Sequence, residues 1–418
     1  MCTHLSRGRV LVSSLCGLLM AGMLMAVGLL APRGFTSGQS PRGSVNDTPK
    51  LGAFAALPDT PAAWGDVTPP GPAASHLVVS WDSKAAAAYL DQRTTGWTRG
   101  GAIDHGTFCI SCHTALPYAL ARSALRADLG ERAPSPTERQ LLDSVTKRVR
   151  LWKDVQPFLS GPTESRGTES VMNALILVTY DAPTGVLSDD AQQALDTMWE
   201  RQLKTGEKAG AWPWFSLGNE PCEAQDSEYW GATLAAAAIG SATREYQTAP
   251  EIQENLKLLR GYLLRVEHEQ SLLNRLSLLW AASKLPGLLS PDERGAIVSE
   301  ALTRQHPDGG WSASSLIAPT WRRHDGTPQE TKSDGYGTGV VSFILEQAGV
   351  SRTRNELKAA LSWLARNQNR ATGAWPAYSL NKQRDPASDV GKFMSDAATA
   401  YSVLALTGNE SNGTGSLP

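Results

Sequence analysis

A repeated unit constrains the fold of this chain more than any other feature of its sequence. Each copy consists of an apolar stretch, a glutamine and a short polar segment that closes with Gly-Trp or Gly-x-Trp. The four copies contain Gln92 and Trp97, Gln202 and Trp212, Gln305 and Trp311, and Gln368 and Trp375. Such self-similarity is typical of repeat architectures, in which each unit buries its apolar face against its neighbours.

A second apolar segment, rich in alanine and glycine, follows each copy, and small residues allow helices to approach closely. The long gaps between copies have room for two degenerate units, with inner segments near residues 169–175 and 274–278. Strand signals are almost absent. The sequence therefore predicts an all-α body of six helix-pair repeats over residues 76–408, either stacked as an open solenoid or closed on itself.

The Gln-to-Gly-x-Trp unit resembles the QW repeat of squalene–hopene cyclase-like and prenyltransferase-like proteins, over roughly residues 80–407. The resemblance implies an (α/α)6 toroid whose inner helices line a central cavity. It does not carry the activity, because the chain lacks the DxDD motif of the cyclases and the zinc-binding Asp-x-Cys pair of the protein prenyltransferases. The resemblance thus predicts the fold and leaves the chemistry open.

The sequence holds one CxxCH element, formed by Cys109, Cys112 and His113. This spacing lets two thiols bond covalently to a c-type haem while the histidine ligates its iron. Aligned with the other repeats, the element should occupy the first turn of an inner helix. A disulfide between Cys109 and Cys112 is one alternative, and a zinc half-site is another, although no second ligand pair is visible. We expect covalent haem c.

The sequence leaves the distal ligand of this iron open. Met394 is one candidate, because ring closure would place the last repeat beside the first. Met172, His105 or an open distal position are the alternatives.

Four carboxylates, Asp226, Glu228, Asp334 and Asp396, are expected at the starts of inner helices. Acidic residues at these places ordinarily cap helices and interact favourably with the helix dipole. As a set converging on one cavity, they could instead serve as general acids and bases. Neighbouring aromatic residues would suit an isoprenoid or a glycan ligand; they are Trp214, Tyr229, Trp230, Trp321 and Tyr336.

The first 33 residues form a targeting segment, in which Arg7 and Arg9 precede an apolar run over residues 10–31. This run exceeds the ~7–15 residues usual in a signal peptide and approaches the ~20 that span a bilayer. We favour an uncleaved signal anchor over a cleaved signal peptide. Either places the body outside the cytoplasm, in the periplasm or an equivalent compartment, and an anchor would tie it to the inner membrane. Residues 34–75 should form a flexible linker, and residues 409–418 a disordered tail.

The net charge and the cysteine content limit which partners and which thiol chemistry the chain is expected to have. A net charge of −2 without a long basic run gives no reason to expect nucleic acid. Outside the targeting segment only Cys109, Cys112 and Cys222 remain. If the first two hold a haem, Cys222 should be a free thiol.

These features predict an exported c-type haem-binding toroid, linked to redox or electron transfer through a partner protein, that acts on a hydrophobic substrate in its cavity. The alternative is a haem-free toroid enzyme, glycan-active or similar to a divergent terpene cyclase, that uses the inner-helix carboxylates.

Overall fold

The computed structural model describes residues 80–100, 103–158 and 161–408. Helices in these residues alternate between an outer and an inner layer. The outer helices are α1 (Ser83–Gly100), α3 (Pro136–Arg150), α5 (Asp189–Arg201), α8 (Gln253–Arg265), α10 (Pro291–Thr303) and α12 (Asn355–Asn367). The inner helices are α2 (Ala115–Asp128), α4 (Pro162–Asp181), α6 (Ser227–Ser241), α9 (Leu272–Lys284), α11 (Gly335–Gln347) and α13 (Phe393–Thr407). A short helix α7 (Arg244–Thr248) and a hairpin of β1 (Ile103–Asp104) and β2 (Thr107–Phe108) complete the secondary structure named here.

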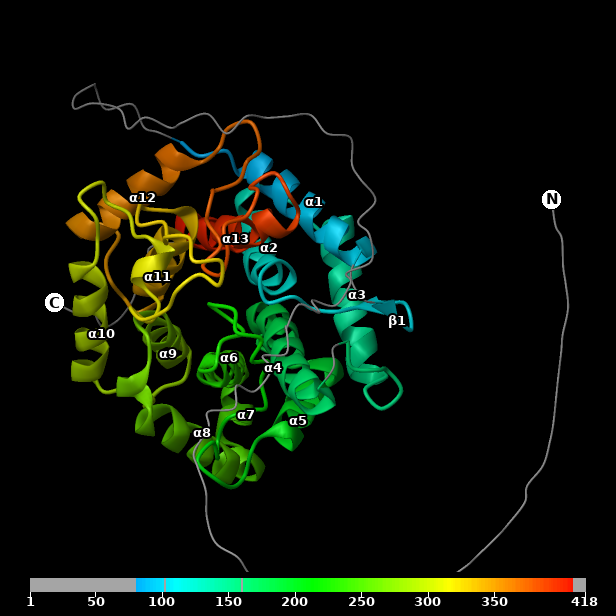
Figure 1. Ribbon diagram of the computed structural model, residues 1–418. Helices are drawn as coiled ribbons and strands as arrows, with labels where there is room; N and C mark the ends of the chain where they lie inside the picture. Colours follow the sequence, from blue (N-terminus) through cyan, green and yellow to red (C-terminus); the bar gives the residue numbers. More distant parts are fainter. Residues whose placement is uncertain (1–79, 101–102, 159–160, 409–418) are drawn as a thin grey trace, which may run out of the picture. The chain divides into compact units, whose positions relative to one another are not determined.

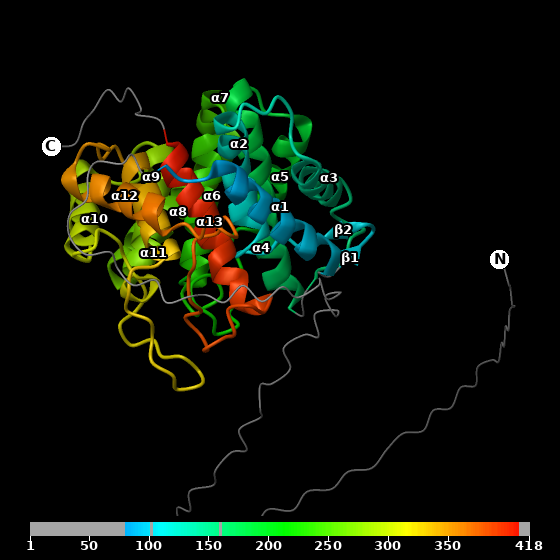
Figure 2. The ribbon, with the colours of Figure 1, turned by 90° about the horizontal axis from the view of Figure 1, so that it is seen from above.

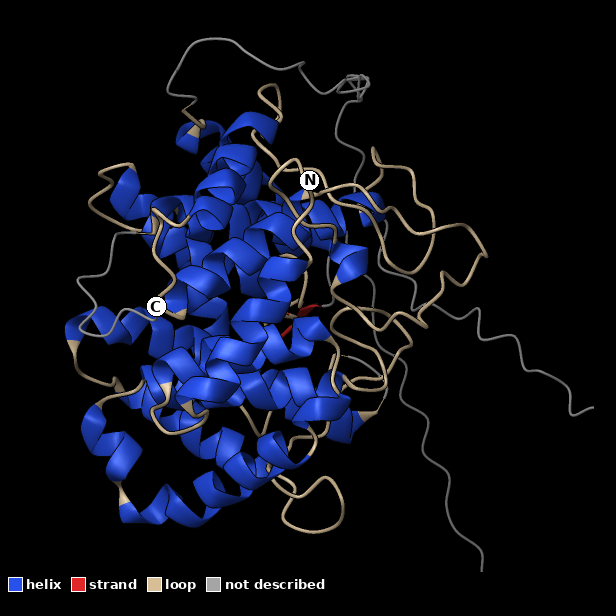
Figure 3. Ribbon diagram, turned by 90° about the vertical axis from the view of Figure 1, so that its left-hand side faces the viewer, coloured by secondary structure: helices blue, strands red, loops and turns tan. Residues whose placement is uncertain are grey.

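The inner helices form a closed ring. Each of α2, α4, α6, α9, α11 and α13 contacts the next in this order, and α13 contacts α2 (Figure 1). The outer helices pack around them, and helices make up most of the body (Figure 3). The expected all-α ring of six helix pairs is therefore confirmed for the described residues, and the open solenoid is wrong.

Burial distinguishes the two layers. Most residues of α6, α11 and α13 are buried, whereas α3, α5 and α12 bury one face only. An inner helix has neighbours on both sides and a third behind it, so it must be apolar nearly all round. Gly339 of α11 allows one such close contact, because a Cβ atom there would lie 2.8 Å from the Ser402 nitrogen of α13.

The repeated glutamines join each repeat to the next outer helix. In three repeats the side-chain nitrogen donates two hydrogen bonds, one to a glycine carbonyl of its own loop and one to a carbonyl at or just before the start of the following outer helix. The acceptors are Gly210 and Asn255 for Gln202, Gly309 and Glu356 for Gln305, and Gly373 and Asp82 for Gln368. Because Asp82 precedes α1, the last of these bonds closes the ring.

The tryptophan of each of these repeats is fully buried and holds the end of the outer helix that precedes it. The indole nitrogens of Trp212, Trp311 and Trp375 donate to main-chain oxygens of Met198, Ala301 and Leu364 at 2.6–2.8 Å. These oxygens belong to the last turns of their helices, where carbonyl groups lack intrahelical donors.

The first copy differs from the other three. Trp97 lies inside α1 and donates to the Cys109 carbonyl at 2.7 Å, while Gln92 is exposed on the same helix. Because the four copies share one pattern, their tryptophans should occupy equivalent places, and for Trp97 this expectation is wrong.

Three long connections, residues 202–226, 304–334 and 368–392, precede inner helices α6, α11 and α13; we call them the three long loops. The loop before α11 projects furthest from the ring (Figure 2). Hydrogen bonds join the loops: Trp321 Nε1 donates to Leu380 O at 3.0 Å, and the Glu220 amide donates to Asn381 Oδ1 at 2.9 Å. They position the residues considered next.

The targeting segment 1–33, the linker 34–75 and the tail 409–418 lie outside the described residues. Among the helices that the structure describes, none has the length and apolar character required to cross a membrane. The expected anchor over residues 10–31 remains a prediction.

Candidate functional site

The CxxCH element forms a turn between β2 and α2. Helix α2 begins at Ala115, with Thr114 at its N-cap position, so the expectation that Cys109–His113 form the helix's first turn is wrong. Ser111 stabilises the turn, because its hydroxyl accepts from the Ala115 amide at 3.0 Å. The element therefore immediately precedes an inner helix.

His113 lies between two aromatic side chains. Its ring stacks on Phe393 of α13, with centroids 3.7 Å apart and an angle of 18° between the planes. Trp97 of α1 meets it edge-on at 5.1 Å. Part of the His113 surface stays accessible. Residues of the first and last repeats thus fix the position of the His113 imidazole.

A hydrogen-bonded chain leads from the His113 ring to Asp396. Thr114 Oγ1 lies 2.8 Å from His113 Nδ1 and 2.7 Å from Asp396 Oδ2. The threonine has one proton, which it donates to the carboxylate, so its oxygen accepts the Nδ1 proton of the histidine. His113 Nε2 is then the unprotonated nitrogen, and no described residue forms a hydrogen bond with it. Desolvation, followed by the charge of Arg93, lowers the pKa of His113 to about 3, which keeps the imidazole neutral.

The three described cysteines are unpaired. Desolvation, followed by the negative charge of Glu169, raises the pKa of Cys109 to about 12. Desolvation, followed by Cys222 and Glu223, raises the pKa of Cys112 well above its ordinary value. Both groups are therefore neutral thiols at pH 7, and they are not joined in the alternative disulfide.

Met394 follows Phe393 in the first turn of α13 and is buried in the apolar core. Met394 is therefore the sequence neighbour of Phe393, the residue that stacks on His113. Met172 of α4 is equally part of the core. The role of Met394 as distal ligand remains a prediction.

Two of the four expected carboxylates accept hydrogen bonds that stabilise the fold. Asp334 is the N-cap of α11 and accepts from the amides of Tyr336, Gly337 and Ala313 at 2.7–2.9 Å. Burial nevertheless raises the pKa of Asp334 to about 6. Asp396, 1% exposed, accepts from Tyr89, Arg93 and Thr114. Helix capping explains Asp334, and an ion pair within a hydrogen-bond network explains Asp396.

The other two lie at the start of α6. Asp226 Oδ2 accepts from the Asn274 amide at 3.0 Å, and burial raises the pKa of Asp226. Glu228 instead receives a hydrogen bond from the largely exposed Lys208 at 2.5 Å. The four carboxylates therefore have separate partners and do not form one bonded catalytic set.

Glu220 is the acidic residue that the sequence analysis missed. Its residue is 7% exposed, and its carboxylate receives no hydrogen bond from any described residue. Asn381 instead binds its main chain on both sides, through the amide at 2.9 Å and the carbonyl at 2.8 Å. Desolvation, followed by the charge of Asp226, raises the pKa of Glu220 to about 7. Glu220 and Asp226 thus form a pair of acids with different environments.

The expected aromatic lining is wrong in part. The Tyr229 hydroxyl donates to the Leu263 carbonyl of α8, so this ring points into the outer layer. Trp321 is bound within the three long loops. Tyr336, by contrast, packs edge-on against Tyr401 of the neighbouring inner helix, with centroids 5.9 Å apart.

Two pockets, of about 270 and 560 Å³, lie away from these residues. The smaller is lined by residues 181–187 and 241–245, and the larger by the β1–β2 hairpin and α3. A haem bound by His113 would need open space beside that ring, and neither pocket is lined by His113. Within the described part of the chain, no group of three or more His, Cys, Asp or Glu side chains could hold a bare metal ion.

No protein family and no curated protein matches the chain. Solved structures do resemble it. One is the GH76A alpha-1,6-mannanase from Salegentibacter sp. HEL1_6, with 13% identity, 78% of this chain and 100% of the other covered, and a TM-score of 0.47. A possible member of the GH105 family from Klebsiella pneumoniae has 12% identity, covers 84% of this chain and 98% of its own, and has a TM-score of 0.44.

A possible GH105 member from Salmonella enterica has 13% identity over 78% of this chain and 93% of its own, also with a TM-score of 0.44. An inactive variant of the mannanase, in complex with alpha-1,6-mannotriose, matches with the same TM-score. At this level, similarity to solved structures supports no conclusion about the activity or the substrate of this chain.

Proposed function

We propose that the chain is an exported c-type haem-binding toroid that takes part in electron transfer. The observation that carries the proposal is the hydrogen bond between His113 Nδ1 and Thr114, which leaves His113 Nε2 without a partner among the described residues. Iron ligation through Nε2 requires that this nitrogen carry no proton. The unpaired thiols of Cys109 and Cys112 agree with it.

In this proposal Cys109 and Cys112 would hold the haem through two thioether bonds, which addition of each thiol to a vinyl group would form without an oxidant. His113 Nε2 would ligate the iron. Bound haem would supply one-electron redox chemistry. A partner protein for electron transfer and a membrane anchor at residues 10–31 belong to the same proposal.

Covalent attachment is the test. The full chain, produced in a host with a working haem-attachment system, should be red and keep its Soret band after denaturation. His113→Ala should change the iron spectrum while leaving helical content intact, and Cys109→Ala with Cys112→Ala should abolish covalent attachment. Cys222→Ala is the matched control and should keep the covalent haem. Colourless wild-type protein from such a host would refute the proposal.

A second candidate function rests on a different observation: Glu220 is only 7% exposed, its carboxyl has no hydrogen-bond donor among the described residues, and the charge of Asp226 acts on it. With a pKa near 7, Glu220 can hold a proton at neutral pH, while Asn274 favours the ionised form of Asp226 by donating to it. A protonated acid next to an ionised carboxylate is the arrangement that glycoside hydrolysis uses. We propose, as the alternative, a haem-free toroid enzyme that cleaves glycosidic bonds.

This alternative predicts that colourless protein releases reducing ends from a panel of polysaccharides. Glu220→Gln should lower the rate at least about 100-fold, the usual contribution of a general acid. Glu207→Gln, at an exposed position, is the control and should leave the rate unchanged. Equal activity of Glu220→Gln and wild type would exclude Glu220 as the acid.

A further inference from the structure

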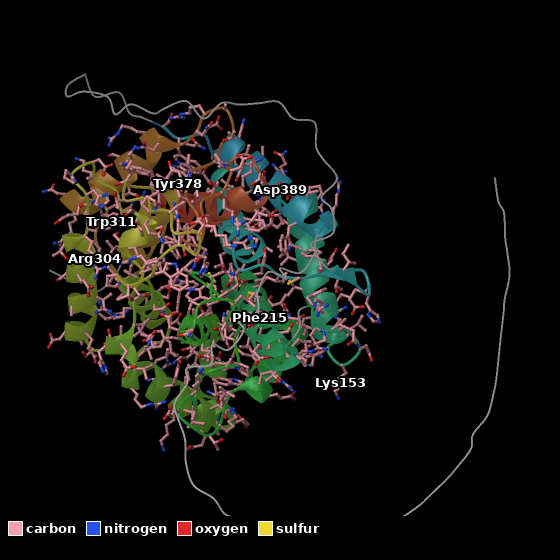
Figure 4. All side chains as sticks on the ribbon, in the orientation of Figure 1. Lys153, Phe215, Arg304, Trp311, Tyr378 and Asp389 are labelled. Atoms are coloured by element: carbon pink, nitrogen blue, oxygen red, sulfur yellow. The ribbon has the colours of Figure 1, made fainter. Side chains whose placement is uncertain are left out.

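The three long loops lie at the same end of the ring (Figure 2) and precede three of the six inner helices. In the view along the ring, Phe215 of the first loop lies near the middle of the molecule (Figure 4). The first loop therefore reaches over the end of the ring instead of following its edge.

The second and third loops are joined through main-chain atoms. Arg323 is 6% exposed, and its guanidinium donates to the carbonyls of Ser379 and Pro328, at 3.0 and 2.7 Å. The next residue, His324, donates its amide hydrogen to the Asn381 carbonyl at 2.8 Å. Arg323 and His324 thus hold the main chains of both loops together.

The first loop is joined to each of the other two. Asn381 of the third loop binds both sides of the Glu220 main chain, since Oδ1 accepts from the amide and Nδ2 donates to the carbonyl. From the second loop, His324 Nε2 donates to the Gly218 carbonyl at 2.6 Å. Because His324 also binds Asn381, the three loops form one closed hydrogen-bonded circuit, in which each link supports the other two.

The circuit covers an acid that has no partner in the fold. Glu220 is 7% exposed, its carboxyl receives no hydrogen bond from a described residue, and it lines neither pocket. Burial, followed by the charges of Cys222, Tyr401 and Glu220, raises the pKa of Tyr336 well above its ordinary value, so Glu220 lies near the start of α11. A ligand as large as a sugar can reach this carboxyl only if the loops move apart.

We propose that the three long loops are a lid over Glu220, that Asn381 and His324 latch it, and that it opens to admit a ligand. This inference rests on the second proposed function, in which Glu220 acts as the acid on a glycan. Loops that are joined by a few hydrogen bonds open at a lower free-energy cost than packed helices, so the lid can open while the ring stays folded.

Carbodiimide labelling of the full chain tests the lid, because the reagent modifies only carboxyls that it can reach. The probe is a water-soluble carbodiimide with glycinamide at a fixed pH, and tandem mass spectrometry of peptides gives the rate at each residue. In wild type, Glu220 should label at least about tenfold more slowly than the exposed Glu207. Asn381→Ala removes two hydrogen bonds between loops and should raise the Glu220 rate about tenfold.

Asn369→Ala is the matched control in the same loop. The Asn369 side chain accepts from the Ala371 and Thr372 amides at 3.0 and 3.1 Å. Alanine there again removes two bonds to main-chain groups, but none between loops. The Glu220 rate should therefore stay at its wild-type value.

His324→Ala tests the latch from the second loop. It removes the bond to Gly218 at an exposed side chain, where substitution disturbs the fold little, and should also raise the Glu220 rate. In Asn381→Ala, the His324 amide should exchange its hydrogen faster than in wild type, although alanine keeps the carbonyl that this amide binds.

Equal labelling of Glu220 and Glu207 in wild type, or unchanged Glu220 rates in both latch variants, would overturn the lid. If Asn381→Ala fails to fold, the Glu220 rate in His324→Ala decides alone. If the rates rise as expected but wild type cleaves no polysaccharide, the lid stands and the glycosidase function is lost.

Discussion

The side chain of Gln368 forms two hydrogen bonds with the main chain of Asp82. Its nitrogen donates to the Asp82 carbonyl at 2.9 Å, and its oxygen accepts from the Asp82 amide at 2.6 Å. Gln368 follows the last outer helix, and Asp82 precedes the first. The contact is thus the seam at which the ring closes.

Replacing Gln368 should destabilise the contact that closes the ring. Gln368→Ala removes both bonds to Asp82 and leaves the Gly373 carbonyl without a donor, so the free energy of unfolding should fall by about 1–3 kcal/mol. Gln92→Ala, at the exposed glutamine of the first copy, should change it by less than about 0.5 kcal/mol. Urea unfolding followed by circular dichroism measures both, and equal losses would contradict the assignment.

Close approach at Gly231 gives a second prediction. A Cβ atom there would overlap the Trp214 ring, so Gly231→Ala should destabilise the fold by about 1–3 kcal/mol through overpacking. Gly261→Ala in α8 meets no atom within 4 Å and should instead stabilise it by up to about 1 kcal/mol. Thermal melts distinguish the signs. A stabilised Gly231→Ala protein would show that Trp214 does not pack there.

Glu220 should make stability depend on pH. Its folded pKa of about 7 exceeds the ordinary 4.5, so the folded state binds more protons between these values, and the free energy of unfolding falls as pH rises from 4.5 to 7. Glu220→Gln removes this contribution, which is at most about 3 kcal/mol. Denaturant titrations at several pH values should show that the free energies of unfolding of wild type and Glu220→Gln depend differently on pH. Glu207→Gln should run parallel to wild type, and a parallel Glu220→Gln curve would show an ordinary pKa.

Cys222 should be an unpaired but unreactive thiol. Desolvation, followed by Glu223 and Glu220, raises its pKa well above the ordinary value, and alkylation requires the thiolate. Native protein at pH 8 should therefore alkylate at Cys222 at least about tenfold more slowly than protein in urea, as followed by peptide mass spectrometry. Failure to label Cys222 in unfolded, unreduced protein would reveal a disulfide partner.

The repeat made the helical ring predictable, but not the end of the first outer helix. Helix α1 continues through Gln92 and Trp97, whereas α5, α10 and α12 end before the glutamine of their copy. The turn at Cys109 was found by spacing, but the start of α2 depends on the Ser111 side chain.

The environments of the acidic residues were not predictable. Asp396 meets Tyr89 and Arg93 across about 300 residues of chain, and no local pattern encodes that contact. Glu220 looks like an ordinary loop residue in the sequence. The structure shows it 7% exposed, with its main chain held by Asn381 from another long loop.

The Gln368–Asp82 seam also bears on how the fold comes apart. An open stack of repeats frays from its terminal units, each of which has a neighbour on one side only. Here the first and last units are neighbours, so neither can detach without breaking contacts on both of its sides. Heating should therefore leave no partly frayed ring, and amide hydrogens of α2 and α13 should exchange as slowly as those of α6 and α9, on the far side of the ring.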